Sequence, residues 1–407
     1  MGFRGREMSL VEFIVLFGLM TSILAMGTDV MLPALPDIGR DLGVRDPNGP
    51  QLVITAFFLG FAGGQILVGP LSDRFGRRPV IFAGSALFVA ASFLSMTTSD
   101  WTIMLAARFL QGLGGAAPRV VAVAIVRDRF EGRAMAQVMS AIMAVFILTP
   151  VVAPALGQLL IAIGGWRACF AALVVLAAVT MLWFGLRQPE SLAVGDRQPL
   201  TRGNLARGIG RIVASRQAVG YTLAAGFAFG PMIGYLSSAQ QVFQVAYDTG
   251  ALFVVYFGIS ALSIGLASLV NARLVMRYGM RRLTAVALGA MTMLGLALSL
   301  VVVLTGGQPG LPLFMGWLLA SFFCLGTLFG NLNALAMEPL GAIAGLGAAF
   351  VGSVSTFVGL GFGLVIGQGF DGSAAPVIFG FALGGCAAIV IMTLTERSMV
   401  RAGQPLR

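Results

Sequence analysis

The chain has 407 residues, of which 58% are hydrophobic and only 10% are charged, a composition far outside that of soluble globular proteins. Its formal net charge of +10 would suit a nucleic-acid-binding protein, but the basic residues stand in short segments between long apolar runs, which excludes a nucleic-acid partner. Histidine is absent and the three cysteines are scattered within apolar runs, so we expect no metal site, no disulfide framework and no enzyme.

Apolar runs long enough to cross a bilayer as helices recur along the whole chain. They predict twelve transmembrane spans, at residues 9–35, 51–72, 79–98, 101–126, 134–162, 167–187, 218–243, 250–274, 283–305, 311–335, 344–369 and 374–395. We therefore predict an all-α membrane protein with two pseudo-symmetric six-helix halves, at 1–187 and 218–407, joined by a basic cytoplasmic linker at 188–217. No small-residue cleavage site follows the first run, which we interpret as an uncleaved span rather than a signal peptide.

The distribution of arginine predicts the orientation of the spans. All 26 basic residues are arginine. If the N-terminus is cytoplasmic, 21 of them fall on the cytoplasmic side and three on the opposite side, while Arg108 and Arg119 lie inside the fourth span. Since cytoplasmic loops of membrane proteins are enriched in basic residues, both termini are predicted to face the cytoplasm.

Two acidic residues belong to the first span. Asp29 lies within it, roughly 10 Å from the outer edge at about 1.5 Å per residue, and Glu12 lies near its cytoplasmic start. Ionisable groups within spans are costly and are functional candidates by default. Asp29 is therefore a candidate proton carrier, with a static Asp–Arg strut and a helix cap as alternatives. Glu12 is a second candidate for proton coupling or an interfacial residue.

The loop after the second span carries GPLSDRFGRRPV, residues Gly69 to Val80, which concentrates charge in a chain that otherwise avoids it. A shift of 203 residues, half the chain length, lands on ARLVMRYGMRRL, Ala272 to Leu283. The arginines and one glycine recur in this second copy, whereas Asp73 corresponds to Met276. Such repetition indicates a duplicated, pseudo-two-fold transporter with its site between the halves.

GPLSDRFGRRPV resembles motif A (G-x-L-x-D-R-x-G-R-R/K) of the major facilitator superfamily. With twelve spans and a degenerate second copy, the resemblance covers the whole chain. More narrowly, TDVMLPALP (28–36), RFLQGLGGAA (108–117) and AIVRDRFEGRAM (124–135) resemble the bicyclomycin-resistance branch of the drug:proton antiporters. The resemblance implies the major facilitator fold and transport by alternating access.

The resemblance also implies a cytoplasmic gate. Its six residues in the motif are Gly69, Asp73, Arg74, Gly76, Arg77 and Arg78. Asp73 would pair with a nearby arginine and face the positive N-terminal end of the eleventh span, and this lock would break on each cycle. A simple positive-inside anchor is the alternative, which accounts for the arginines but not for Asp73, Gly76 or their spacing.

The fourth span contains two arginines and a glutamine. Arg108 lies roughly 12 Å deep by the helical rise, a depth similar to that of Asp29, and the resemblance places the first and fourth spans side by side. The two residues are thus predicted partners in proton coupling. Gln111 and Arg119 lie near the same helix face as Arg108 and are candidate cavity residues, with a gate contact or snorkelling toward water as the alternative for Arg119.

The fifth span contains TPVVAPALGQ, residues 149–158, which resembles the antiporter motif of exporters, usually written G-P-x-x-G-G. Alanine and glutamine replace two of the glycines, while Gly157 is kept. Pro150 and Pro154 predict a kink because each removes a backbone hydrogen bond. The match favours export, and a kink with no bearing on transport direction is the alternative.

The second half has no counterpart of Asp29 or Arg108. Its seventh and tenth spans instead carry aromatic and amide side chains, among them Phe227, Tyr235 and Asn331. We predict that these three residues contribute an aromatic, amphipathic wall for the substrate, with ordinary core packing as the alternative.

The sequence thus predicts proton-coupled efflux of small amphipathic compounds by a functional monomer in the bacterial inner membrane, powered by the proton gradient without a cofactor. A dedicated exporter or importer of a metabolite such as a sugar or an amino acid is the alternative, but its site would need several convergent hydrogen-bonding groups. A membrane enzyme would need a nucleophile, metal ligands or paired carboxylates at one depth, and a channel or a sensor would not need the repeated gate motif.

Overall fold

The computed structural model describes residues 8–197 and 202–401, which are helical with short connections and contain no strand. The long helices are α1 (Leu10–Asp29), α3 (Leu52–Phe75), α4 (Arg77–Thr97), α5 (Trp101–Arg129), α6 (Gly132–Arg187), α8 (Arg216–Gln241), α9 (Phe253–Tyr278), α10 (Met280–Thr305), α11 (Leu311–Met337), α12 (Ala344–Gln368) and α13 (Ala375–Arg401). The shorter helices are α2 (Leu35–Asp41), α7 (Arg202–Ala214), η1 (Leu32–Ala34), η2 (Gly49–Gln51), η3 (Val194–Asp196), the π-helical η4 (Val242–Ala246), η5 (Gly250–Leu252) and η6 (Glu338–Ile343).

Eleven helical segments of the described chain are long and apolar enough to cross a membrane. One of them, α6, has 56 residues, which at 1.5 Å per residue would extend roughly 84 Å, far beyond a hydrocarbon core of about 30 Å. The helix is interrupted at Gly164 and at Gly165, which has φ 67°, a conformation that glycine adopts without steric cost. This break falls between the predicted fifth and sixth spans, so α6 holds both, and the all-α membrane fold is confirmed.

The first apolar segment, Leu10–Asp41, is divided into three helical pieces, which was not predicted. Helix α1 stops at Asp29, and the 3₁₀ helix η1 and the short helix α2 continue the chain to Asp41. The prolines at positions 33 and 36 explain the change, since each lacks a backbone N–H and begins a new helical segment at its first or second position. Asp29 is therefore the last residue of α1, within an apolar helical segment that continues from Leu10 to Asp41.

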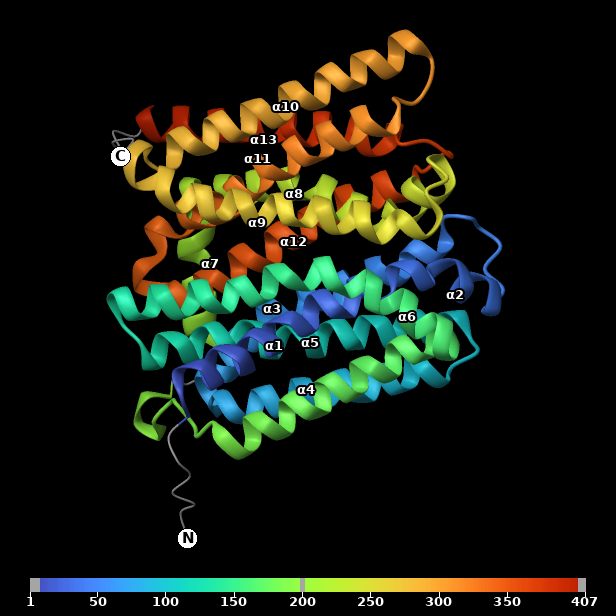
Figure 1. Ribbon diagram of the computed structural model, residues 1–407. Helices are drawn as coiled ribbons and strands as arrows, with labels where there is room; N and C mark the ends of the chain where they lie inside the picture. Colours follow the sequence, from blue (N-terminus) through green and yellow to red (C-terminus); the bar gives the residue numbers. More distant parts are fainter. Residues whose placement is uncertain (1–7, 198–201, 402–407) are drawn as a thin grey trace. The chain divides into compact units, whose positions relative to one another are not determined.

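The chain divides into two compact units. Unit 1 comprises Met1–Val44 and Ala56–Thr201, and unit 2 comprises Arg45–Thr55 and Arg202–Arg407. In unit 1, α1 and α4 each pack against α5 and α6, and in unit 2, α8 packs against α11, α12 and α13 (Figure 1). The start of α3 belongs to unit 2 and the rest to unit 1. The predicted domain limits, 1–187, 188–217 and 218–407, remain a prediction.

The predicted linker contains a helix, α7, that was not predicted. Helix α7 buries Ile212, while Arg207 and Arg211 on the same helix are exposed. Gly208 lies so close to Leu346 of α12 that an added Cβ would be 2.4 Å from a methyl group. Helix α7 thus belongs to unit 2 and packs on α12.

Candidate functional site

The gate motif occupies the turn between α3 and α4, and Gly76 makes this turn. Its φ of 101° and ψ of 160° belong to a region that is essentially restricted to glycine. A Cβ at this position would also lie 2.6 Å from Glu190 Oε2. Gly76 therefore allows α3 to end and α4 to begin within one residue, which brings the preceding aspartate and the following arginines together.

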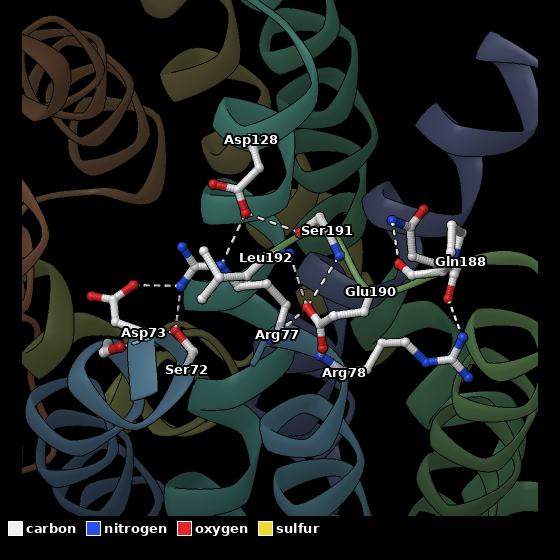
Figure 2. Close-up of polar contacts among 11 residues, drawn as sticks. Ser72, Asp73, Arg77, Arg78, Asp128, Gln188, Glu190, Ser191 and Leu192 are labelled. Carbon is white, nitrogen blue, oxygen red and sulfur yellow. Dashed lines mark hydrogen bonds and ion pairs between the residues drawn. The ribbon is translucent and has the colours of Figure 1, made fainter. Parts of the chain in front are cut away.

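Arg77 is the centre of a polar network in unit 1 (Figure 2). Its Nη1 donates to Asp73 Oδ1 at 2.6 Å and to Ser72 Oγ at 2.8 Å. Its Nε donates to Asp128 Oδ2 at 3.0 Å, and that same oxygen accepts from Ser191 Oγ at 2.9 Å. The Arg77 side chain is only 4% exposed, so two carboxylates neutralise a charge that is costly to bury alone. The network ties the end of α5 to the α3–α4 turn.

A segment directly after α6 closes this cluster from the other side. Glu190 accepts from the backbone N–H groups of Arg77 at 2.9 Å and Arg78 at 3.0 Å, which places a carboxylate at the N-terminus of α4, where the helix dipole favours negative charge. The Arg78 guanidinium donates to the carbonyl oxygens of Gly185 and Gln188 at the end of α6. Figure 2 shows Glu190 and Arg78 bridging these two helix ends.

The remaining two motif residues have different surroundings. The Gly69 carbonyl oxygen accepts a hydrogen bond from Ser72 Oγ at 2.9 Å. This bond helps to orient the Ser72 hydroxyl group, which accepts a hydrogen bond from Arg77. Arg74 is exposed, with its guanidinium 5.0 Å from the centre of the Phe75 ring. Asp128 and Glu190 were not predicted as gate residues, although Asp128 belongs to the segment AIVRDRFEGRAM. Each bonds to Arg77, which lies 51 residues from Asp128 and 113 residues from Glu190 in the chain.

The second motif copy keeps the turn but not the network. Gly279 between α9 and α10 has φ 78° and ψ 156°, close to the values at Gly76. Met276, which stands where the first copy has its aspartate, is 87% exposed. Arg281 forms one ion pair, at 3.4 Å from Glu338, and its buried Nε and Nη1 have no hydrogen-bond partner among the described residues. In the first copy the same two donors of Arg77 are bound by Asp73 and Asp128.

Asp29 is buried at the end of α1, with 3% of its surface exposed. Its Oδ1 accepts from Thr28 Oγ1 at 2.9 Å, and the same hydroxyl donates to the Ala25 carbonyl oxygen. An acid in this position belongs to the apolar interior of unit 1 and stands where the helix stops and its terminal carbonyl groups are released.

Arg108 is fully buried in α5 and reaches the same stretch of α1. Its Nη2 donates to the Gly27 carbonyl oxygen at 2.9 Å, and its Nη1 donates to Gln111 Oε1. The guanidinium lies 4.5 Å from the centre of the Phe57 ring, a favourable cation–π distance. Gln111 in turn donates to Ser92 Oγ of α4 at 2.6 Å. This polar chain connects α1, α5 and α4, and Ser92 was not predicted.

The antiporter-like segment of α6 packs against the end of α1. An added Cβ at Gly157 would lie 2.3 Å from the Val30 carbonyl oxygen, next to Asp29 in the chain. Eight residues before Gly157 in α6, Thr149 Oγ1 donates a hydrogen bond to Ser22 Oγ of α1 at 2.8 Å. Pro150 and Pro154 lie inside α6 without ending it. The segment therefore sets how closely α6 approaches the residues around Asp29.

The two other charged candidates, Arg119 and Glu12, contact residues other than Asp29. The Arg119 guanidinium lies over the Phe146 ring, 4.4 Å from its centre, between α5 and α6. Glu12 accepts from Arg187 Nε at 2.6 Å, from Arg187 Nη2 at 2.7 Å and from Trp183 Nε1 at 3.0 Å. This bidentate geometry ties the start of α1 to the end of α6.

The candidate wall residues of unit 2 have distinct neighbours. The Phe227 ring is 5.7 Å from that of Phe362. Tyr235 is buried in an aromatic cluster, stacked on Phe257 at 5.9 Å and edge-on to Phe322 at 5.0 Å. Asn331 of α11 exchanges two hydrogen bonds with Asn271 of α9, at 3.0 and 3.1 Å.

The chain has two helical units, and each has a glycine turn between its second and third long helices. Unit 1 also buries an acid, Asp29, and an arginine, Arg108, among its spans. These features define a polytopic membrane protein of the transporter class. The chain belongs to the Major Facilitator Superfamily, because the sequence model of this family matches residues 17–364. The predicted family is thus confirmed.

Two bacterial proteins are similar in sequence to all or part of the chain. A bicyclomycin resistance protein homolog of Haemophilus influenzae is 30% identical over 98% of this chain and 100% of its own length. The multidrug resistance protein D of Escherichia coli is 34% identical over 45% of this chain and 46% of its own length.

Solved structures share the fold at low sequence identity. The D-xylose-proton symporter has a TM-score of 0.73 at 15% identity and covers 94% of this chain and 97% of its own. The human organic anion transporter MFSD10 has a TM-score of 0.66 at 19% identity, over 94% of this chain and 98% of its own.

Proposed function

We propose that this transporter exports small amphipathic compounds in exchange for protons, as a monomer in the bacterial inner membrane with both termini in the cytoplasm. The proton gradient powers it without a cofactor. Its family and the names of its relatives, resistance proteins for bicyclomycin and for multiple drugs, support this proposal. Proton coupling rests on one observation: the carboxyl group of Asp29 is buried at the end of α1. Helices α5 and α6 both contact this end of α1.

The contacts around Asp29 suggest how a proton is coupled to movement. Arg108 binds the carbonyl oxygen two residues before Asp29, and Gly157 packs on the residue directly after it. A shift of α1 relative to α5 or α6 would therefore change the polar surroundings of the carboxyl group. Protonation neutralises Asp29 and removes the cost of keeping a charge in the membrane interior, which favours one arrangement of α1 over the other.

The other predicted residues take roles in the same cycle. The network of Asp73, Arg77 and Asp128 holds the cytoplasmic ends of α3, α4 and α5 in one arrangement. Gln111 and Arg119, with Phe227, Tyr235 and Asn331 of unit 2, are proposed to contribute to substrate binding. Pro150, Pro154 and Gly157 fix the path of α6 beside α1.

The test is dye uptake into inside-out proteoliposomes with an acidic lumen, for the parent protein and for Asp29→Asn. Asparagine keeps the size and cannot carry the proton, so we expect gradient-driven uptake to be abolished while equilibrium dye binding survives. Glu12→Gln is the comparison variant, because Glu12 is the second predicted proton site and is ion-paired with Arg187. Full pH-gradient dependence in Asp29→Asn, with its loss in Glu12→Gln, would move the coupling site to Glu12.

A further inference from the structure

An apolar groove runs along the surface of unit 1 between α3 and α4. Its volume is about 410 Å³, within the roughly 300–1,000 Å³ typical of sites for small molecules. The sides are formed by residues such as Leu67 and Leu71 of α3 and Ala83 of α4, and the floor is formed by α5 around Gly114. All lining residues are apolar, so the groove suits a hydrocarbon chain rather than a polar solute.

The groove has the length of one bilayer leaflet. On α3 it extends from Phe75 at the gate turn to Gly64, eleven residues or roughly 16 Å at the helical rise. Half of a hydrocarbon core of about 30 Å is about 15 Å. Leu67 is 52% exposed and Phe75 is 47% exposed, so the groove opens to the surface along its length. These dimensions fit an acyl chain that enters from the leaflet on the gate side.

Arg74 stands at the gate end of the groove and is not used by the polar network. Arg77 and Arg78 are engaged by carboxylates and carbonyl oxygens. Arg74, in contrast, is exposed and forms no ion pair within the described part of the chain, and its guanidinium lies over Phe75, which lines the groove. A cation thus lies next to the gate-side end of an apolar groove.

We propose that this groove is a binding site for one phospholipid with an anionic headgroup. One acyl chain lies in the groove, and the phosphate accepts hydrogen bonds from the Arg74 guanidinium, a group whose planar donors match phosphate oxygens. The bound lipid therefore contacts the turn that carries the gate motif. Arginine near a membrane surface favours anionic over zwitterionic lipids, so phosphatidylglycerol is preferred to phosphatidylcholine.

The experiment is native mass spectrometry of the purified full-length transporter, titrated in detergent with phosphatidylglycerol and, separately, with phosphatidylcholine of identical acyl chains. The parent protein is expected to retain one phosphatidylglycerol. Arg74→Gln is expected to retain it about fivefold less, the effect of one basic residue near the surface. Ala83→Phe, which fills the groove and leaves every charge in place, is expected to lose both lipids.

Matched controls separate the site from general changes in charge and bulk. Arg277→Gln removes the corresponding arginine of the second copy, which also stacks on an aromatic ring, Tyr278 at 5.3 Å. Ala90→Phe adds the same bulk at an exposed position of α4 that does not line the groove. Both controls are expected to retain phosphatidylglycerol like the parent. Equal retention of the two lipids by the parent, or unchanged retention in Arg74→Gln and Ala83→Phe, would overturn the proposal.

Discussion

Arginine serves three different purposes in unit 1, and its surroundings decide which. Arg77 is buried between two carboxylates, Arg108 is buried against a carbonyl oxygen and an aromatic ring, and Arg74 stays exposed. A buried charge is tolerated only when partners replace the water it loses, and removing one partner is then far more costly than the pair is stabilising. The partners of these arginines are therefore the positions at which single substitutions have the largest effects.

The two carboxylates that hold Arg77 are expected to differ in importance. Asp128 is 16% exposed and Asp73 is 33% exposed, so water screens the second pair more strongly. We expect Asp128→Asn to destabilise the protein by about 2–3 kcal/mol, and Asp73→Asn by about 1 kcal/mol or less. Thermal unfolding in detergent measures both, and an equal or reversed order would show that the network is not centred on Asp128.

The glycine turns of the two motif copies allow strain and packing to be separated. Both glycines have backbone conformations that cost about 1–3 kcal/mol for other residues. At Gly76 an added methyl group would also displace Glu190 from the start of α4, whereas nothing lies within 4 Å at Gly279. Gly76→Ala is therefore expected to lower the unfolding temperature more than Gly279→Ala does. The difference corresponds to about 1 kcal/mol of unfolding free energy, the contribution of the lost helix cap. Equal shifts would mean that Glu190 adds nothing to the stability of the turn.

At the scale of the element, close approach of helices replaces the hydrophobic effect as the source of specificity. Lipid is as apolar as the side chains that it contacts, so helices in membranes associate through tight packing and hydrogen bonds. The crossing of α6 and α1 near Gly157 and the polar chain from α1 through α5 to α4 are both of this kind.

The α6–α1 crossing gives a prediction at this scale. Gly157→Ala would place a methyl group 2.3 Å from a backbone carbonyl oxygen, and backbone cannot move aside as a flexible side chain can. We expect a destabilisation of about 1–3 kcal/mol together with slower transport, because α1 carries Asp29. Gly289→Ala in α10 is the control, since nothing lies within 4 Å of that position and alanine favours helix. Similar effects of both substitutions on unfolding and transport would contradict a specific role of the crossing.

At the scale of the whole molecule, the arginine bias predicts a topology that labelling can test. In a variant whose three native cysteines are replaced by alanine, a single cysteine is introduced at exposed Arg45 or at exposed Asp196. Arg45→Cys is expected to react with a membrane-impermeant maleimide in cells whose outer membrane alone is permeabilised. Asp196→Cys is expected to react only after the inner membrane is disrupted. The opposite pattern would invert the proposed orientation.

The elements themselves were largely predictable from the sequence, and so was the family. The break within α6 lay between the predicted fifth and sixth spans, because a glycine pair ends an apolar run there. The end of α1 at Asp29 was missed although two prolines follow it, since hydropathy continues across the break. Helix α7 was missed because its sequence is basic and only amphipathic, and its packing on α12 is visible only in the fold.

The sequence by itself determined the number and apolar extent of the spans and the turn between α3 and α4, because transfer into lipid and backbone sterics are local properties. Only the tertiary structure decided which side chains meet: Glu190 with the start of α4, Arg108 with Gly27, and Gly157 with the residue after Asp29. These contacts depend on how each helix is rotated about its axis and how closely its neighbours approach. Rotation and approach are set by the packing of whole helix faces, which no single stretch of sequence contains.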